Sequence, residues 1–96
     1  MSIFAVEYVY DPEQEDLRAE HRPEHRGWLE QLVEQGVVLA SGPFVDGSGA
    51  LLVVASGSEA ELNSVLAQDP FAREGVISAV KTAAWNPIIG VFKDHV

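Results

Sequence analysis

The chain has 96 residues, of which 47% are hydrophobic, and this length predicts one domain with a modest core over residues 1–96. Fifteen acidic against six basic residues give a formal net charge of -9, which argues against binding to nucleic acid or to an anionic membrane surface. There is no cysteine, and the N-terminus lacks a signal-peptide pattern, so a cytoplasmic location is expected.

The first half of the chain predicts a strand followed by a helix. Residues 3–11, IFAVEYVYD, are rich in β-branched and aromatic side chains, as expected of a largely buried strand. Residues 13–22 have the composition of a loop or a short helical turn. Pro23 suits the first turn of a helix, and Gly36 suits its end. Between them, apolar residues recur at three- and four-residue spacing: Trp28, Leu29, Leu32 and Val33.

A hairpin and a second helix are predicted next. Residues 37–46 and 50–56 read as apolar strands, and the connecting DGSG contains an Asp-Gly pair, which is a strong hairpin signal. Ser58 and Glu61 have the spacing of a capping box, which places the start of a helix there. That helix is expected to end near Asp69.

The last third predicts a turn or one short helical segment over residues 69–75, and then a strand over 76–85. The tail PIIGVF, residues 87–92, predicts a short extra strand. The order β-α-β-β-α-β is that of an α+β, ferredoxin-like sandwich, with one antiparallel sheet and two helices on one face. Because nothing covers the other face, we expect a homodimer or a higher oligomer in which two sheets pack together.

Two histidines lie four positions apart, at 21 and 25. If the helix begins at Pro23, His25 lies on its apolar face, and two interpretations stay open: a partly buried histidine hydrogen-bonded to backbone, or a general base and acid. The i, i+4 separation is also that of two zinc-binding histidines. Since His21 is expected outside the helix and no third ligand is evident, no metal site is predicted.

Other candidate residues also have two interpretations. Asp69 before Pro70 is typical of a helix start, but an aspartate can also orient a histidine from another element. The segment Ser41, Gly42, Pro43 and Phe44 indicates a bulge, an edge strand, the close approach of a ligand or a simple bend. Arg22 is either an anion anchor or a surface charge. The glycines form no dinucleotide-binding fingerprint, and no cofactor is predicted.

Three segments together resemble the YciI-like (YCII-related) family of the dimeric α+β barrel superfamily: RPEH at 22–25, GVVLASGP at 36–43 and DPFAREGV at 69–76. The resemblance implies a ferredoxin-like protomer, a dimer, and a histidine–aspartate pair in a cleft. Matched residue by residue, the pair falls on His25 and Asp69. In many members a leucine follows the histidine, whereas here Arg26 and Gly27 follow, and the glycine suggests a looser helix start or room for a ligand.

The leading hypothesis is a small cofactor-independent enzyme of the isomerase, lyase or dehydrochlorinase type. His25 acts as general base and acid on a small cyclic or aromatic oxygenated substrate, and Asp69 orients it. Arg22 or Ser41 holds a substrate oxygen, and Trp28 and Phe44 form apolar walls. Two alternatives stay open: a non-catalytic dimeric module that binds a small ligand, and a purely structural hydrogen bond between His25 and Asp69.

Overall fold

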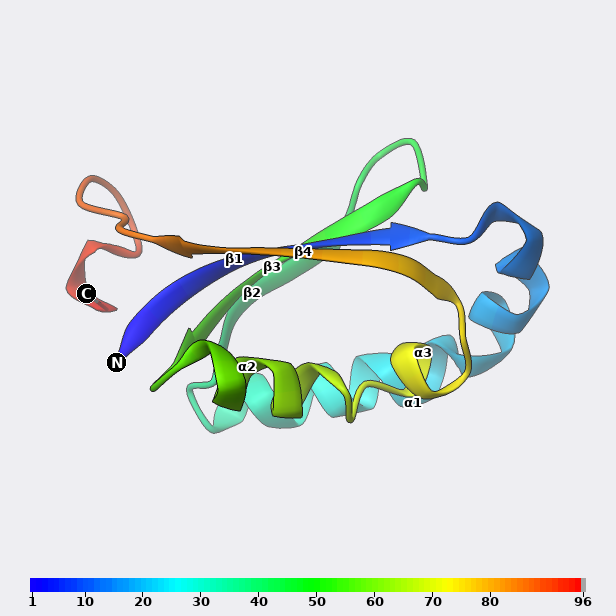
Figure 1. Cartoon of the computed structure of the whole chain (residues 1–96), viewed down its shortest axis with the longest axis horizontal. Helices are drawn as coiled ribbons and strands as arrows, with labels where there is room; N and C mark the ends of the chain where they lie inside the picture. The colour runs from blue at the N-terminus through cyan, green and yellow to red at the C-terminus, as the bar shows by residue number, and fades with distance from the viewer. Residues whose placement is uncertain (96) are drawn as a thin grey trace.

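The computed structural model describes residues 1–95. Its centre is a four-stranded antiparallel sheet in the order β2-β3-β1-β4, and the helices lie together on one face of this sheet (Figure 1). This is the predicted α+β, ferredoxin-like architecture. The elements are β1 (Ser2–Tyr10), η1 (Pro12–Gln14), α1 (Glu15–Glu34), β2 (Val38–Pro43), β3 (Gly49–Ser56), α2 (Glu59–Leu66), α3 (Pro70–Arg73), β4 (Ile77–Trp85) and η2 (Lys93–His95).

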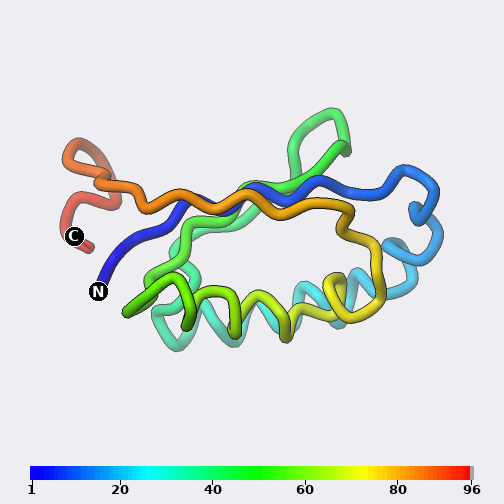
Figure 2. Tube along the Cα trace, viewed as in Figure 1, coloured from blue at the N-terminus to red at the C-terminus, as the bar shows by residue number. Residues whose placement is uncertain are grey.

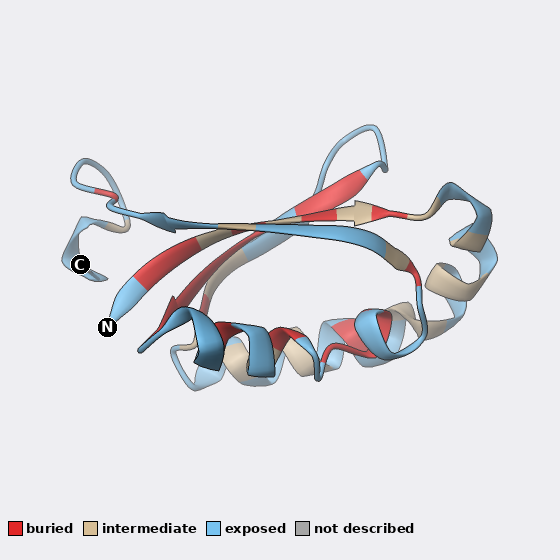
Figure 3. Ribbon diagram, in the orientation of Figure 1, coloured by how far each residue is buried: buried red, intermediate tan, exposed pale blue. Residues whose placement is uncertain are grey.

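The core lies between the sheet and the helices. Figure 3 shows the degree of burial along the strands and helices. Every second side chain of β1, from Phe4 to Tyr10, belongs to the core cluster between the sheet and the helices. This alternation also turns Tyr8 and Tyr10 toward the helices, and Tyr8 is among the largest fully buried side chains. The buried residues of this cluster are Phe4, Val6, Tyr8, Tyr10, Val38, Ala50, Leu52, Val54, Leu62, Leu66, Phe71 and Val76.

Helix α1 is longer than the sequence predicted. It begins at Glu15 and not at Pro23, so the loop expected over residues 13–22 is wrong. A proline inside a helix removes one backbone hydrogen bond and costs about 3 kcal/mol. Here Leu17 packs against the core and the Arg18 guanidinium lies 4.5 Å from the centre of the Tyr10 ring, and such contacts compensate for the proline. The Pro23 ring itself is exposed to solvent.

The hairpin and the later helix starts agree with the sequence. Strand β2 lies at the sheet edge and has a bulge between Val38 and Ala40. Gly47 in the hairpin loop has a φ of 75°, in the left-handed region that favours glycine. The Ser58 hydroxyl accepts a hydrogen bond from the Glu61 N–H, as expected of an N-cap.

The extra strand expected over residues 87–92 is not formed in the described part of the chain. Pro87 has no N–H to donate to a neighbouring strand, and Gly90 has a φ of 108° that breaks extended backbone. Phe92 instead packs beside Ile3 on the sheet face opposite the helices. Figure 2 shows this tail at the same end of the molecule as the N-terminus. Among residues 1–95, no helix has the length and apolar character needed to cross a membrane.

Candidate active site

His25 is the buried residue of α1, with 7% of its surface exposed. Its ring stacks on the Phe71 ring, with centroids 3.8 Å apart and planes inclined by 6°. Its Nδ1 lies 2.7 Å from Oδ1 of Asp69, which stands just before α3. The aromatic contact and the hydrogen bond together hold the imidazole in one orientation.

Asp69 is completely buried and accepts three hydrogen bonds. Oδ1 accepts from the Phe71 N–H at 2.9 Å as well as from His25, and Oδ2 accepts from the Tyr8 hydroxyl at 2.9 Å. An ionised carboxylate only accepts hydrogen bonds, so this arrangement puts the proton of neutral His25 on Nδ1. The lone pair of Nε2 is then free to take a proton. The two interpretations of Asp69 are both correct, because it caps α3 and also binds the histidine.

Tyr8 completes a chain of three side chains that the sequence analysis missed. Burial raises the pKa of its hydroxyl far above the ordinary tyrosine value, and the neighbouring Asp69 raises this pKa further. Tyr8 therefore stays protonated and donates to Asp69 throughout the physiological pH range. The sequence gives one indication of this role: the Tyr8 hydroxyl is a polar group among the apolar side chains of β1 that face the helices.

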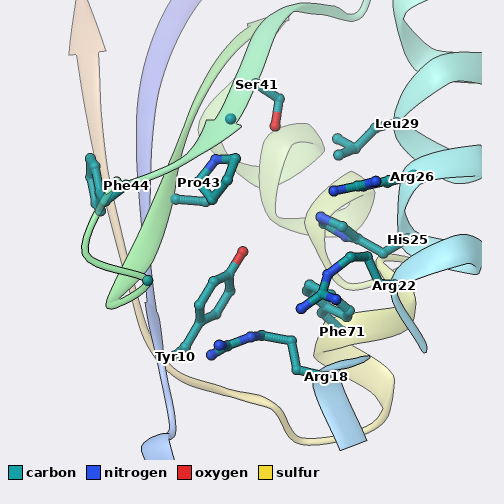
Figure 4. A pocket seen from close by; sticks show the side chains of 13 residues that line it. Tyr10, Arg18, Arg22, His25, Arg26, Leu29, Ser41, Pro43, Phe44 and Phe71 are labelled. Atoms are coloured by element: carbon teal, nitrogen blue, oxygen red, sulfur yellow. The ribbon is translucent and has the colours of Figure 1, made fainter. Parts of the chain in front are cut away.

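An open cleft of about 390 Å³ lies in front of His25, between α1, β2 and the end of β1 (Figure 4). Side chains of Arg18, Arg22 and Arg26 form the helical wall. In Figure 4 the hydroxyls of Tyr10 and Ser41 point into the space opposite this wall. The lining residues are Tyr10, Arg18, Arg22, His25, Arg26, Leu29, Ser41, Gly42, Pro43, Phe44, Gly47, Ala50 and Phe71.

Tyr10 differs from Tyr8 because its hydroxyl faces the cleft. Burial raises the pKa of Tyr10 and Asp69 adds to this, while the positive charges of Arg18 and Arg22 act in the opposite direction. The hydroxyl is therefore a neutral donor at physiological pH. The arginine charges reach the interior of the cleft, where a ligand would bind.

Most of the predicted site residues come together. His25 and Arg22 line the cleft, as do Ser41, Gly42 and Pro43 at the end of β2 and Phe44 directly after it. Asp69 lies behind His25. Trp28 is not among the lining residues, and its ring stacks beside His25, with centroids 6.5 Å apart.

His21 lies inside α1, contrary to the expected position outside the helix, but it does not meet His25 in a metal site. Its Nδ1 is 3.5 Å from a Glu24 carboxylate oxygen, and its Nε2 is 3.5 Å from one of Glu74. Within residues 1–95, no three histidine, aspartate or glutamate side chains form a group suited to a metal ion.

Sequence reasoning missed Arg18 and Arg26, which flank Arg22 on the same wall. The three arginines recur every four residues, and this spacing puts them along one side of a helix. The four-residue spacing is visible in the sequence, but the prediction that the helix starts at Pro23 placed Arg18 in a loop. Leu29 and Phe71 were missed as lining residues as well, and Gly27 lies inside the helix away from the lining.

Comparison with curated proteins gives no match. Among solved structures, one of a 5-chloro-2-hydroxyhydroquinone dehydrochlorinase from Burkholderia phenoliruptrix, in complex with 2,5-dihydroxybenzoquinone, has a TM-score of 0.78 and 23% identity, covering 86% of this chain and 92% of that one. A protein assigned as an antibiotic biosynthesis monooxygenase from Bacteriodes thetaiotaomicron has a TM-score of 0.61 and 15% identity, covering 92% and 90%. A further antibiotic biosynthesis monooxygenase has a TM-score of 0.55 and 18% identity, covering 88% and 96%.

These similarities show the shared fold. The model of the YCII-related domain matches residues 3–86, which includes both members of the buried pair and all of the sheet except Ser2. The chain therefore belongs to the YCII-related family.

Proposed function

We propose that the protein is a cofactor-independent enzyme in which His25 transfers a proton on a small cyclic or aromatic oxygenated substrate. The observation that carries this proposal is the buried contact of 2.7 Å between His25 Nδ1 and Asp69 Oδ1, with the imidazole also lining the cleft. A base held in one tautomer, beside a cavity large enough for a single ring, is suited to general acid–base catalysis.

The reaction begins when Nε2 of His25 takes a proton from a substrate hydroxyl or carbon. The electron pair stays on the substrate, where it is delocalised onto an oxygen. Asp69 stabilises the imidazolium that forms, as the aspartate does in other acid–histidine pairs. The proton then returns to a second substrate atom, which completes an isomerisation. Alternatively, an anion such as chloride leaves with its bonding electrons and His25 releases its proton to solvent, which completes an elimination.

The cleft supplies groups for the developing negative charge. The Arg22 guanidinium and the Ser41 hydroxyl are donors to the substrate oxygen, and preorganised donors of this kind stabilise a transition state more than a ground state. Leu29, Phe44 and Phe71 provide apolar surface for a ring. The dehydrochlorinase of similar fold has a dihydroxybenzoquinone bound, which agrees with a hydroxylated ring as substrate class.

The same proposal includes a homodimer whose sheets face each other. Leu51 and Trp85 lie on the sheet face opposite the helices and are 44% and 43% exposed, so this face has apolar surface to bury. Light scattering of the purified chain tests the dimer. The cytoplasmic location and the organisation as one domain stay predictions.

The test of the enzymatic function compares the wild-type protein with His25→Asn. The asparagine amide can still donate to Asp69 in place of Nδ1, but it has no group equivalent to Nε2. We expect turnover of chlorinated hydroquinones, hydroxyquinols or lactones to fall by a factor on the order of 10² to 10⁴, with stability largely retained. Equal turnover in both proteins would contradict the proposal.

The same experiment distinguishes the alternative of a non-catalytic binding module. If His25→Asn binds hydroxylated rings as tightly as the wild type does, and if neither protein converts any of these compounds, the cleft binds a ligand without reacting with it. If the wild type neither binds nor converts these compounds, and if His25→Ala has lower thermal stability, then the hydrogen bond between His25 and Asp69 has only a structural role.

A further inference from the structure

The helical wall of the cleft carries an unusual concentration of positive charge. The chain has only six Lys and Arg residues, and three of them, Arg18, Arg22 and Arg26, line this one cleft. None of the lining residues is acidic, although the chain has 15 Asp and Glu residues. The acidic side chains of α1 are all exposed. Three of the positively charged side chains therefore surround the cavity, and no carboxylate side chain lines it.

The three arginines have no carboxylate partner among residues 1–95, in contrast to Arg73, which pairs with Glu24 at 3.3 Å. They are spread over about 12 Å of the helix axis, because they recur every four residues at about 1.5 Å per residue. The binding of a single substrate oxygen does not require guanidinium groups over so long a span. A single developing oxyanion beside His25 would use one of these guanidinium groups and leave the others unused.

Arg18 is held at the end of the cleft next to Tyr10. Its Cζ lies 4.5 Å from the centre of the Tyr10 ring, which is a cation–π contact. The Tyr10 hydroxyl points into the same space (Figure 4). A guanidinium with a neighbouring hydroxyl donor is well suited to a carboxylate, whose two oxygens accept two parallel hydrogen bonds from arginine.

We infer that the natural ligand is an aromatic or cyclic carboxylate, whose carboxylate binds to Arg18 and Tyr10 while Arg26 adds positive charge at the other end of the wall. The inference rests on the proposed function for the reacting end of the substrate, which lies at His25 and Arg22. The apolar side chains of Leu29, Phe44 and Phe71 favour an organic anion over an inorganic one.

The test measures binding by NMR titration of backbone amides with three probes. These are 2,5-dihydroxybenzoate, 2,5-dihydroxybenzyl alcohol, which has the same ring with a neutral group, and inorganic phosphate. We expect the carboxylate to bind on the order of tenfold more tightly than the alcohol, with phosphate weaker than the carboxylate. In Arg18→Gln the preference for the carboxylate over the alcohol should largely disappear.

The control variant is Lys93→Gln, which removes one positive charge from η2, outside the cleft. It should keep the preference for the carboxylate, because a distant exposed charge is screened by salt. Three results would overturn the inference: equal binding of the two aromatic probes, an equal loss of preference in Arg18→Gln and Lys93→Gln, or binding of phosphate alone.

Binding by His25→Asn separates this inference from the proposed function. If the enzymatic function is wrong, His25→Asn and wild type show the same turnover, whereas the preference for the carboxylate still depends on Arg18. If the inference is wrong and the function is right, His25→Asn loses turnover, and Arg18→Gln discriminates between the two aromatic probes as the wild type does.

Discussion

Nδ1 of His25 lies 2.7 Å from Oδ1 of Asp69, although the two residues are 44 positions apart in the chain. The contact joins α1 to the start of α3, and the Tyr8 hydroxyl extends it to the central strand β1. A hydrogen-bonded chain of three side chains thus connects the cleft to the centre of the sheet. Each member depends on the next for its orientation or its protonation state.

Replacing Asp69 with asparagine should change the tautomer of His25. The asparagine amide carries both a donor and an acceptor, so it no longer requires the proton to be on Nδ1. We expect the imidazole ¹⁵N resonances in NMR spectra to show a mixture of tautomers, where wild type shows a single one with the proton on Nδ1. Turnover should fall by a factor on the order of 10⁴, as for the equivalent change in a serine-protease triad. An unchanged tautomer in Asp69→Asn would show that Asp69 does not control the imidazole.

Removing the Tyr8 hydroxyl should destabilise the fold. Tyr8→Phe leaves Oδ2 of a completely buried carboxylate without a donor, and a group left unsatisfied in this way costs about 1–3 kcal/mol. Urea denaturation at neutral pH measures this loss in the free energy of unfolding. The matched control is Tyr10→Phe, whose hydroxyl points into the cleft (Figure 4). Its effect should stay within about 0.5 kcal/mol, and a similar loss in both variants would contradict the assigned role of Tyr8.

The stability of the protein should depend on Tyr8 at high pH. Burial raises the pKa of Tyr8 in the folded state, whereas in the unfolded chain it titrates near the ordinary value of about 10. A group of this kind contributes its full stability below that value, and the contribution is lost as the pH rises further. The difference in unfolding free energy between wild type and Tyr8→Phe should shrink by about 1.4 kcal/mol per pH unit above pH ~10.

Urea denaturation of both proteins between neutral and strongly alkaline pH measures this dependence. Absorbance of the tyrosinate ion gives an independent reading, because Tyr8 should ionise only when the protein unfolds. A difference between the two proteins that stays constant across this range would show that Tyr8 titrates normally in the folded state.

Replacing Gly27 with alanine should stabilise the protein by about 1 kcal/mol, because glycine in a helix interior loses more backbone entropy than alanine does. Gly27 lies inside α1, and a Cβ built there meets no atom within 4 Å. The matched control is Gly36→Ala at the end of the same helix. Gly36 has a φ of 76°, so the same change should destabilise by about 1–2 kcal/mol. Thermal denaturation measures both, and two effects of the same sign would contradict the prediction.

Much of the fold was predictable because its signals are local. The β-branched and aromatic composition of β1, the capping of α2 by Ser58 and the Asp-Gly pair of the hairpin each act within a few residues, and the structure has the strand, the cap and the hairpin. The order of the elements then leaves few alternatives to the ferredoxin-like sheet.

The errors arose where a local rule met contacts from elsewhere in the chain. Pro23 predicts a helix start, but contacts of Leu17 and Arg18 with residues of β1 and the core extend α1 to Glu15. Because α1 begins at Glu15, Arg18 lies on the helical wall of the cleft and not in a loop, and His21 lies within the helix. Trp28 was assigned to the wall because its spacing puts it on the same helix face as His25, and in the structure its ring stacks beside His25 without lining the cleft.

The sequence by itself determined the strands and most of the helices, the cap at Asp69 and the residue types available for chemistry. Only the tertiary structure decided that Asp69 meets His25 and Tyr8, and that three arginines face one cleft. The physical reason is the range of the interactions. Propensity, capping and turn geometry depend on neighbours in the chain, whereas the pair and the cleft exist only where the packing of helices on a sheet brings distant segments together.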